Sequence, residues 1–368
     1  LIKNAAVIKK LAKKKHRHKK GRAAEGPMIT RRYAAAAIAI VAVVAAARAA
    51  DTPAKNRTTP WLSSSNASYV SLPRIVKEYA HDSGAFTQGL VFGADGALYE
   101  SDGLYRKSRV RRVELDTGKT LAKNLNANEH FGEGLAAIGE KLYQLTWREG
   151  AMHEYDTKTL RRLSTRAQPF HGEGWGLAYD ETTGLAYGTD GTHRVHVLRP
   201  AHNWAALHVL RVKDERLGGT LIEGLNELEM VEGELWANVL PLRYHKASPC
   251  VGLRRRYYVL RLRGQYLNTQ VARIDINTGN VLGWVDLSAL RDKQSSRVRR
   301  QPHHFVTNGI AYRRAPGRPQ LLATGKQWDS MFDIDLEASN LGPDHVRSRC
   351  DLYLSPTNSH RSSSFFPH

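Results

Sequence analysis

A short pattern recurs five times along the chain, each time leading into a strand-like apolar run. It consists of a polar or aromatic residue, then a glycine or glutamate, then an aliphatic residue, and its copies begin at Gln88, Glu133, Trp175, Asn226 and Asn308. The spacings are 45, 42, 51 and 82 residues, and a period in the forties with several short strands per unit is typical of a β-propeller. The sequence therefore predicts an all-β fold, a five-bladed β-propeller, whose five repeat residues meet in one funnel.

Strand and turn signals also alternate regularly within each repeat. A second strand follows each first strand, as in GEKLYQLTW at 139–147 and ETTGLAYGTDG at 181–191, and turn residues precede it. Outer strands such as VARIDINTGNV at 271–281 end in Asp/Thr/Gly patterns, which are ordinary turn chemistry. We expect residues 75–81, before the first repeat, to pair with residues 331–336 and close the ring of blades.

Two segments carry nearly all of the net charge of +20. Residues 1–32 contain twelve Lys and Arg and one acid, and residues 240–265 contain seven Lys and Arg and no acid, so the rest of the chain carries only +2. A strongly basic chain ordinarily suggests nucleic acid or an anionic membrane as partner. The repeat region lacks a basic stripe, which argues against nucleic-acid binding.

The residues before the repeats divide into three segments. Residues 1–27 are a basic stretch, either a solvated or targeting tail or an upstream sequence translated by mistake. Residues 28–50 follow a signal-peptide pattern, with two arginines before a 14-residue apolar run. That run is shorter than the roughly 20 residues of a spanning helix, so we expect secretory entry (endoplasmic reticulum lumen, vacuole or extracellular space), with a signal anchor as the alternative. Residues 51–69 are a linker with N-glycosylation sequons at Asn56 and Asn66.

The basic stretch of residues 240–265 interrupts a repeat between two strands. Excising it joins Val239 to Tyr266 and restores a plain pair of strands. A loop of this length without its own structure is unusual in a compact domain. We therefore favour a retained intron or gene-model error, and the alternative is a surface loop that binds a partner through its basic residues.

The predicted catalytic domain, residues 70–337, is followed by a polar tail, residues 338–368. The two cysteines are Cys250 in the insertion and Cys350 in the tail. The propeller itself would have no disulfide, so cysteine usage neither supports nor excludes an oxidising compartment. The sixteen histidines show no spacing typical of a zinc site. No metal or other cofactor is predicted, although an axial cation held by backbone carbonyls would leave no sequence signal.

Eight short motifs connect the repeat region with a known family. They read, in order, HDSGAFTQGL (81–90), FGEGL (131–135), LTW (145–147), GWGL (174–177), LNELE (225–229), WANV (236–239), NGIAY (308–312) and TGKQW (324–328). Together they resemble the plant-type glutaminyl cyclases, also called glutaminyl-peptide cyclotransferases, over residues 75–336. The resemblance implies a five-bladed propeller, in agreement with the repeat count. It also implies an enzyme that converts the N-terminal glutamine of a peptide into pyroglutamate with release of ammonia.

The chemistry of cyclisation selects Glu133 as the proton shuttle. A neutral α-amine attacks the side-chain carboxamide, and the departing nitrogen must gain a proton to leave as ammonia. A carboxyl group among aromatic residues suits both transfers, because desolvation raises its pKa toward the working pH. Glu133 lies on the funnel ring beside Phe131 and opposite Trp175, and it matches the family's catalytic glutamate. The alternative is a glutamate that only caps a strand end.

Other polar residues of the ring complete the predicted site. Asn226 and Lys326 are available as fixed donors for the oxyanion, and both match positions that the family uses in its site. Gln88, together with Phe86, matches a substrate-pocket position. Glu227 is expected to be at most a partner of the site residues.

Aromatic residues are predicted to form the pocket walls. Phe131, Trp147 and Trp175 would surround the substrate, and the two indoles would pack on the aliphatic stem of the glutamine and on its ammonium; ordinary propeller core is the alternative. The family tends to place another tryptophan directly after WANV, where this chain has Leu240. Removing the insertion would bring Tyr266 into that place.

Two other functions compete with the cyclase hypothesis. A non-catalytic propeller that binds peptides at its funnel would keep the repeats but could dispense with Glu133 and Lys326. A metal-dependent lactonase-like propeller needs a ring of carboxylates and asparagines, whereas this ring offers one Glu, two Asn, one Gln and one Trp. The preferred hypothesis is a monomeric enzyme acting on peptides or proteins with N-terminal glutamine.

Overall fold

The computed structural model describes residues 68–240 and 269–346. The chain divides into two compact units, Leu1–Arg57 and Thr58–His368, and all described residues belong to the second. Several predicted features lie outside the described residues, so the statements about them stay predictions. They are the signal segment, the sequons, the basic insertion after its first residue, both cysteines and most of the polar tail. Within the two described stretches, no helix is long and apolar enough to cross a membrane.

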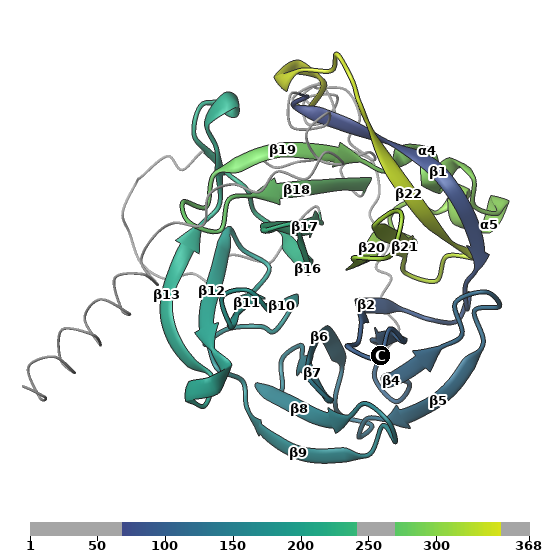
Figure 1. The fold of residues 1–368 in the computed structure, drawn as a ribbon, viewed down its shortest axis with the longest axis vertical. Helices are drawn as coiled ribbons and strands as arrows, with labels where there is room; N and C mark the ends of the chain where they lie inside the picture. The colour runs from purple at the N-terminus through teal and green to yellow at the C-terminus, as the bar shows by residue number, and fades with distance from the viewer. Residues whose placement is uncertain (1–67, 241–268, 347–368) are drawn as a thin grey trace, which may run out of the picture. The chain divides into compact units, whose positions relative to one another are not determined.

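The described chain is almost entirely β-structure, and its strands form antiparallel units of four (Figure 1). Three units are separate sheets of consecutive strands. The first contains β2 (Thr87–Phe92), β3 (Leu98–Asp102), β4 (Arg109–Val113) and β5 (Thr120–Leu125). The second contains β6 (Gly132–Ile138), β7 (Lys141–Thr146), β8 (Ala151–Asp156) and β9 (Arg162–Ala167). The third contains β10 (Leu177–Asp180), β11 (Leu185–Thr189), β12 (Arg194–Arg199) and β13 (Ala205–Arg211).

Eight further strands form one sheet made of two such units. One half contains β16 (Leu225–Val231), β17 (Glu234–Val239), β18 (Gln270–Ile274) and β19 (Val281–Asp286). The other half contains β20 (Thr307–Arg313), β21 (Gln320–Gly325), β22 (Ser330–Ala338) and β1 (Val70–Ala80). The halves meet where β1 runs parallel to β19 at Val70 and Ser71. Short elements complete the described fold: β14 (Lys213–Asp214), β15 (Thr220–Leu221), η1 (Pro200–His202), η2 (Glu215–Leu217), α4 (Ser288–Asp292) and α5 (Ser296–Arg300).

The first strand of the described chain pairs with the last. β1 lies antiparallel to β22, with Ile75 opposite Ile334. This confirms the predicted pairing of residues 75–81 with residues 331–336. The same four-stranded unit is therefore built from both ends of the described chain, so its formation links them.

Five strands lie around the centre of this arrangement (Figure 1). They are β2, β6, β10, β16 and β20; each packs against the next, and β20 packs against β2. Glycine permits the close approach, since a Cβ on Gly89 would lie 2.5 Å from the backbone nitrogen of Leu135, and one on Gly134 would lie 2.5 Å from the Trp175 carbonyl oxygen. The glycine of the repeated pattern is thus required where neighbouring inner strands touch.

Four of the inner strands are irregular at the repeat residue. Their ladders shift register between Thr87 and Gly89, Gly132 and Leu135, Leu225 and Leu228, and Thr307 and Ile310. These shifts enclose Gln88, Glu133, Asn226 and Asn308. A bulge bends a strand and re-aims a side chain, so each of these residues can leave the regular ladder and point toward its counterparts.

Glu227 occupies the place that glycine has in the other four copies. Its side chain is buried, and its carboxylate accepts hydrogen bonds from the backbone N–H groups of Leu90 at 3.4 Å and Ile310 at 3.1 Å. These bonds tie β16 to β2 and β20. Glu227 therefore has a structural role, and no hydrogen bond of the described residues joins it to Glu133 or Lys326.

Apolar side chains pack between neighbouring units. Leu135 of β6 shares a cluster with Tyr99 of β3 and Tyr155 of β8, and Leu90 of β2 shares another with Leu322 of β21. Each of these clusters joins two adjacent units. The packing thereby fixes the inner strands, and the residues that they carry, relative to one another.

Candidate active site

The bulges that begin β2 and β6 bring Gln88 and Glu133 into direct contact. Gln88 Nε2 donates a hydrogen bond to Glu133 Oε1 at 3.0 Å. Gln88 Oε1 in turn accepts from Asn308 Nδ2 at 3.0 Å, and the same Asn308 nitrogen donates to the Thr87 carbonyl at 2.9 Å. This relay from Asn308 to Gln88 to Glu133 fixes the Gln88 amide so that its donor faces the carboxyl group.

Glu133 is buried and only half satisfied. The residue is only 4% exposed, and its second carboxyl oxygen, Oε2, has no hydrogen-bond partner among the described residues. Burial raises the pKa of Glu133 well above its ordinary value; Lys326 opposes this shift, and the charges of Glu173 and Glu149 add to it. A carboxyl group with a raised pKa is suited to general acid–base catalysis, and its unpartnered oxygen can exchange a proton with a bound molecule.

Lys326 follows directly on the end of β21 and is also buried. Its Nζ lies 4.8 Å from the centre of the Phe86 ring, within the range of a cation–π contact. Burial lowers the pKa of Lys326 to about 8, although attraction to Glu133 opposes the shift. At neutral pH the side chain is therefore an ammonium group with little surrounding water, which strengthens its interaction with a developing negative charge.

Aromatic rings gather around Phe131, which directly precedes β6. Its ring centre lies 6.1 Å from that of Phe86, 5.4 Å from Tyr105 and 5.4 Å from Trp147. Phe86, Phe131 and Trp147 were expected in the pocket, and the structure brings them together. Tyr105 was not expected, because a single tyrosine in a turn carries no sequence signal of its own. Its hydroxyl donates to Glu149 at 3.0 Å, one of the acids that raise the pKa of Glu133.

Both predicted wall tryptophans are held by one carboxylate, that of Glu173. Trp147 Nε1 donates to Glu173 Oε2 at 2.7 Å, and Trp175 Nε1 donates to the same oxygen at 3.0 Å. Arg148 Nε donates to the other oxygen at 3.0 Å. Burial alone would raise the pKa of Glu173, but these donors outweigh it and lower the pKa. Glu173 therefore stays ionised, orients the two indoles, and adds negative charge near Glu133.

Asn226 is buried on the inner strand β16 but is not joined to the other predicted catalytic residues by a hydrogen bond of the described residues. Its Oδ1 lacks a hydrogen-bond partner in the described part of the chain, and its backbone carbonyl accepts from Thr189 Oγ1 at 2.8 Å. No hydrogen bond of the described residues links Asn226 to Glu133 or Lys326. Its oxyanion role stays a prediction.

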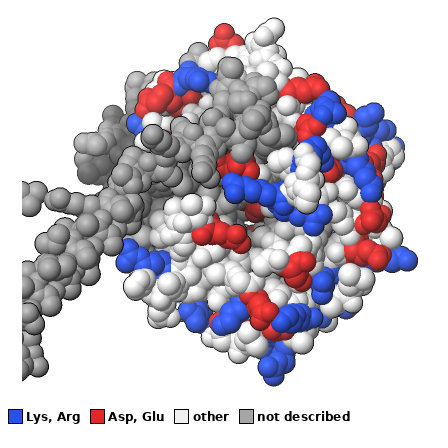
Figure 2. Space-filling view, viewed as in Figure 1, with Lys and Arg blue, Asp and Glu red and all other residues white. Residues whose placement is uncertain are grey.

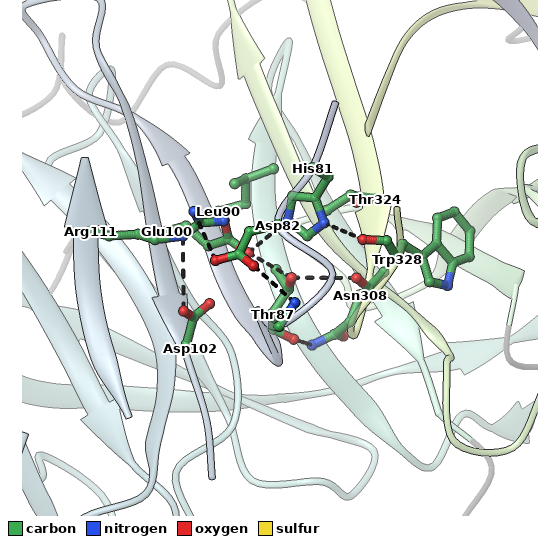
Figure 3. A network of polar contacts seen from close by, with 12 residues as sticks. His81, Asp82, Thr87, Leu90, Glu100, Asp102, Arg111, Asn308, Thr324 and Trp328 are labelled. Atoms are coloured by element: carbon green, nitrogen blue, oxygen red, sulfur yellow. Dashed lines mark hydrogen bonds and ion pairs between the residues drawn. The ribbon is translucent and has the colours of Figure 1, made fainter. Parts of the chain in front are cut away.

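The loop that carries Lys326 is fixed from two sides. The Lys326 N–H donates to the Val306 carbonyl at 2.9 Å, and the Gln327 N–H donates to the Ala85 carbonyl at 2.6 Å. One residue further, the Trp328 carbonyl accepts from His81 Nδ1 at 2.9 Å (Figure 3). The backbone around Lys326 is thereby anchored to the segment that precedes β2.

A buried carboxylate, Glu100 on β3, connects this loop with the Gln88 strand (Figure 3). It accepts from His81 Nε2 at 3.0 Å, from Thr87 Oγ1 at 2.6 Å and from Arg111 Nη2 at 2.5 Å. Burial alone would lower the pKa of His81, but the charge of Glu100 outweighs it and raises the pKa. Both ring nitrogens of His81 face acceptors, which is the hydrogen-bonding pattern of an imidazolium. The sequence analysis gave none of these residues a role in the site, although His81 and Thr87 belong to the motif at residues 81–90.

The arrangement provides a proton-transfer group, a desolvated cation and a set of aromatic walls in one place. No group of three or more His, Cys, Asp and Glu residues that could hold a metal occurs within residues 68–240 and 269–346. Basic and acidic side chains are interspersed on the face shown in Figure 2, without a continuous basic stripe over the described residues. The site is thus suited to proton transfer and to stabilising an oxyanion on a small polar group.

Comparison with known proteins gives three consistent findings. A sequence model of the family described as glutamine cyclotransferase matches residues 37–244 and 263–336; the unmatched residues between them lie within the basic insertion. The chain is 34% identical to a glutaminyl-peptide cyclotransferase of Arabidopsis thaliana over 285 residues, which is 75% of each protein. The crystal structure of Myxococcus xanthus glutaminyl cyclase is similar with a TM-score of 0.58 and 30% identity, covering 74% of this chain and 100% of that one.

Proposed function

The chain belongs to the glutamine cyclotransferase family, and we propose that it is a glutaminyl-peptide cyclotransferase. As an acyltransferase it would transfer the γ-acyl group of an N-terminal glutamine from the side-chain nitrogen to the α-nitrogen, giving pyroglutamate and ammonia. The observation that carries the proposal is the buried Glu133 carboxyl group, held at one oxygen by Gln88 and free at the other.

The reaction needs two proton transfers, and Glu133 is placed to perform both. The neutral α-amine attacks the side-chain carbonyl carbon, which forms the new C–N bond and a tetrahedral oxyanion. The attacking nitrogen loses a proton, and the departing nitrogen gains one, so the old C–N bond breaks and ammonia leaves. Glu133 relays this proton and returns to its starting state, which is the behaviour expected of a carboxyl group whose pKa is raised toward the working pH.

Lys326 is proposed to stabilise the oxyanion, with Asn226 as a second polar group at the site. A cation that is already desolvated interacts strongly with charge that develops in the transition state. Gln88 then acts on Glu133, because its donor is fixed by Asn308 and holds one carboxyl oxygen in place. The other oxygen, Oε2, has no partner among the described residues and stays available to the substrate.

The aromatic walls are proposed to bind the glutamine side chain. Phe131 and Trp147 lie in contact, and Trp175 is held by the same carboxylate as Trp147, so the walls are ordered before substrate arrives. A pre-organised apolar enclosure favours the methylene stem of glutamine and excludes water from the reacting groups. This supports peptides with N-terminal glutamine as the substrate class.

We further propose a five-bladed β-propeller spanning residues 70–337 as the catalytic domain. The support is the fivefold sequence repeat together with the closed sequence of contacts among the five inner strands. The signal-peptide pattern of residues 28–50 and the sequons at Asn56 and Asn66 support a glycoprotein of the secretory pathway. We propose that it acts as a monomer.

The test is ammonia release from peptides that begin with glutamine, with pyroglutamate identified by mass spectrometry. Wild type is compared with Glu133→Gln and with Glu129→Gln, a matched control at an exposed glutamate on the segment before β6. Glu133→Gln should lower kcat by roughly 10²- to 10⁴-fold, the usual contribution of a positioned acid or base, and Glu129→Gln should not. Near wild-type turnover by Glu133→Gln would remove Glu133 from the mechanism. Peptide binding without any ammonia release by wild type would instead favour a non-catalytic peptide-binding propeller.

A further inference from the structure

A cavity beside the candidate active site has no part in the proposed proton transfers. Its volume is about 440 Å³, and it lies between the segment that precedes β2 and the loop that joins β3 to β4. Gly103 and Leu104 of that loop line the cavity. Gly103 is also in contact with the active site, because a Cβ there would lie 2.7 Å from Phe131 Cζ and 3.1 Å from Gln88 Cγ. One short loop therefore borders both spaces.

Three lining residues of the cavity, Asp82, Asp102 and Arg109, belong to an ionic cluster whose charges balance. Figure 3 shows part of this cluster. Three cations face three carboxylates: His81, Arg109, Arg111, Asp82, Glu100 and Asp102. Arg109 bridges two of the acids, donating to Asp82 at 2.7 Å and to Asp102 at 2.5 Å. With all six groups ionised the cluster is neutral, and protonation of one carboxyl group would make it positive.

The rim of the cavity carries two cations that this cluster does not neutralise. Arg106 and Lys107 line the cavity and are exposed. Neither side chain forms an ion pair or a hydrogen bond within the described residues. The charged residues that line the cavity are thus two acids and three bases, so its net charge is positive even with both acids ionised. A positive cavity favours an anionic group over a cationic one.

One polar group that lines the cavity is buried without a partner. Asp102 is 3% exposed, and its Oδ1 lacks a hydrogen-bond partner among the described residues. Burial and the nearby charge of Glu100 raise the pKa of Asp102 to about 7, although Arg111 and Arg109 oppose the shift. In its protonated form this carboxyl group is a donor, and it can then hydrogen-bond an incoming carboxylate.

We propose that this cavity, the acidic-residue subsite, binds an aspartate or glutamate side chain of the peptide substrate through Arg106 and Lys107. The proposal rests on the proposed function, since it requires glutamine to occupy the neighbouring active site. Each extended residue advances a peptide by about 3.3–3.6 Å, so the loop that separates the two spaces places the subsite within reach of the second or third residue. The enzyme would thus select peptides that begin Gln-Glu or Gln-X-Glu.

The experiment compares kcat/KM for matched peptides that carry Ala, Glu or Lys at the second position, and a second set that varies the third. Wild type should prefer the best Glu peptide over its Lys counterpart by about 5- to 30-fold, as expected for two partly exposed ion pairs. The difference should lie in KM, because the subsite does not touch the reacting atoms. It should shrink at about 0.5 M salt, where exposed charges are screened.

Charge reversal at the rim supplies the decisive variant. Arg106→Glu combined with Lys107→Glu should reverse the preference while leaving the Ala peptide unaffected. Lys119→Glu combined with Lys123→Glu is the matched control, because both lysines are exposed on the same four-stranded unit, line no part of the cavity, and give the same change in net charge. The control variant should keep the wild-type preference.

Binding of the product peptides separates this proposal from the proposed function. Pyroglutamyl-Glu-Ala and pyroglutamyl-Lys-Ala, and their third-position counterparts, can be titrated by calorimetry whether or not the enzyme turns over. Cyclisation of all peptides with equal kcat/KM would overturn the subsite and leave the cyclase intact. A preference for lysine in wild type would show that the acids of the ionic cluster govern the cavity, which would also overturn the proposal. Selective binding of the Glu products without ammonia release would support the subsite and contradict the cyclase.

Discussion

Replacing Glu100 by glutamine tests whether the buried network behind Lys326 holds the site together. The change keeps the shape of the side chain but removes the charge that faces His81 at 3.0 Å and Arg111 at 2.5 Å. The side chains of Glu100, His81 and Arg111 are fully buried, and leaving a buried charge without its partner costs about 3–5 kcal/mol. For a domain of this size each kcal/mol corresponds to about 2–4 °C in Tm, so we expect a decrease on the order of 10 °C.

The pH dependence of this loss has a definite sign. Because the folded-state pKa of His81 is raised, its contribution to stability is complete below its unfolded pKa and disappears as the pH rises through the folded pKa. The deficit of Glu100→Gln should therefore be larger at about pH 6 than at about pH 9. The assay is thermal melting of both proteins at both pH values, with kcat measured well below either Tm.

A matched double variant separates lost charge pairing from lost packing. Combining Glu100→Gln with Arg111→Met removes the stranded guanidinium, and it should recover part of the lost Tm. If Glu100→Gln melts within about 2 °C of wild type, or if the deficit grows with pH, then the network does not stabilise the fold as argued. A folded Glu100→Gln protein with unchanged kcat would show that Lys326 does not depend on this anchor.

Three further predictions concern the inner ring, the pH profile and the insertion. Gly176→Ala should destabilise the protein by about 3 kcal/mol or more, since the added Cβ would overlap the Asn226 carbonyl oxygen. Gly342→Ala, with open space around it, should not destabilise the protein. Comparing the Tm of both variants with that of wild type tests this prediction. kcat/KM should rise with pH as the substrate amine, with a pKa near 7.7–8.0, loses its proton, and it should fall as Lys326 loses its proton near a pKa of about 8. A value of kcat/KM that is still rising at about pH 10 would contradict the need for the Lys326 charge. EDTA should have no effect on the rate. Deleting Leu240–Gln265 should raise both Tm and the cyclisation rate; a more active full-length chain would show that the insertion is a genuine element.

The repeated pattern predicted the inner strands well because it encodes two local requirements of the ring. Glycine is needed where one inner strand touches the next, as at Gly89 and Gly134, and the residue before it lies in a bulge, as Gln88 and Glu133 do. Both requirements are satisfied within a few residues of sequence. A period therefore reveals them, and it also placed the pairing of β1 with β22.

The supports of the site were not predictable in the same way, because they depend on contacts between distant strands. Glu173 acts through two tryptophans from different units, and Glu100 acts through His81 and Thr87. In the sequence each is one charged residue among many, with no periodic neighbour that would distinguish it from a solvated one. Only the folded arrangement shows that these carboxylates are enclosed and shared.

Glu133 and Glu227 show why burial alone does not identify the catalytic acid. Burial raises the pKa of both carboxyl groups well above the ordinary value, and both belong to the repeated pattern. They differ by one position in it: Glu227 stands where glycine normally allows two strands to touch, and its two oxygens accept the N–H groups of Leu90 and Ile310. Glu133 stands in the bulge before that position, so its Oε2 has no partner among the described residues. A carboxyl group whose oxygens are both bonded to backbone can hold strands together, whereas only one with a free oxygen can pass a proton to a substrate.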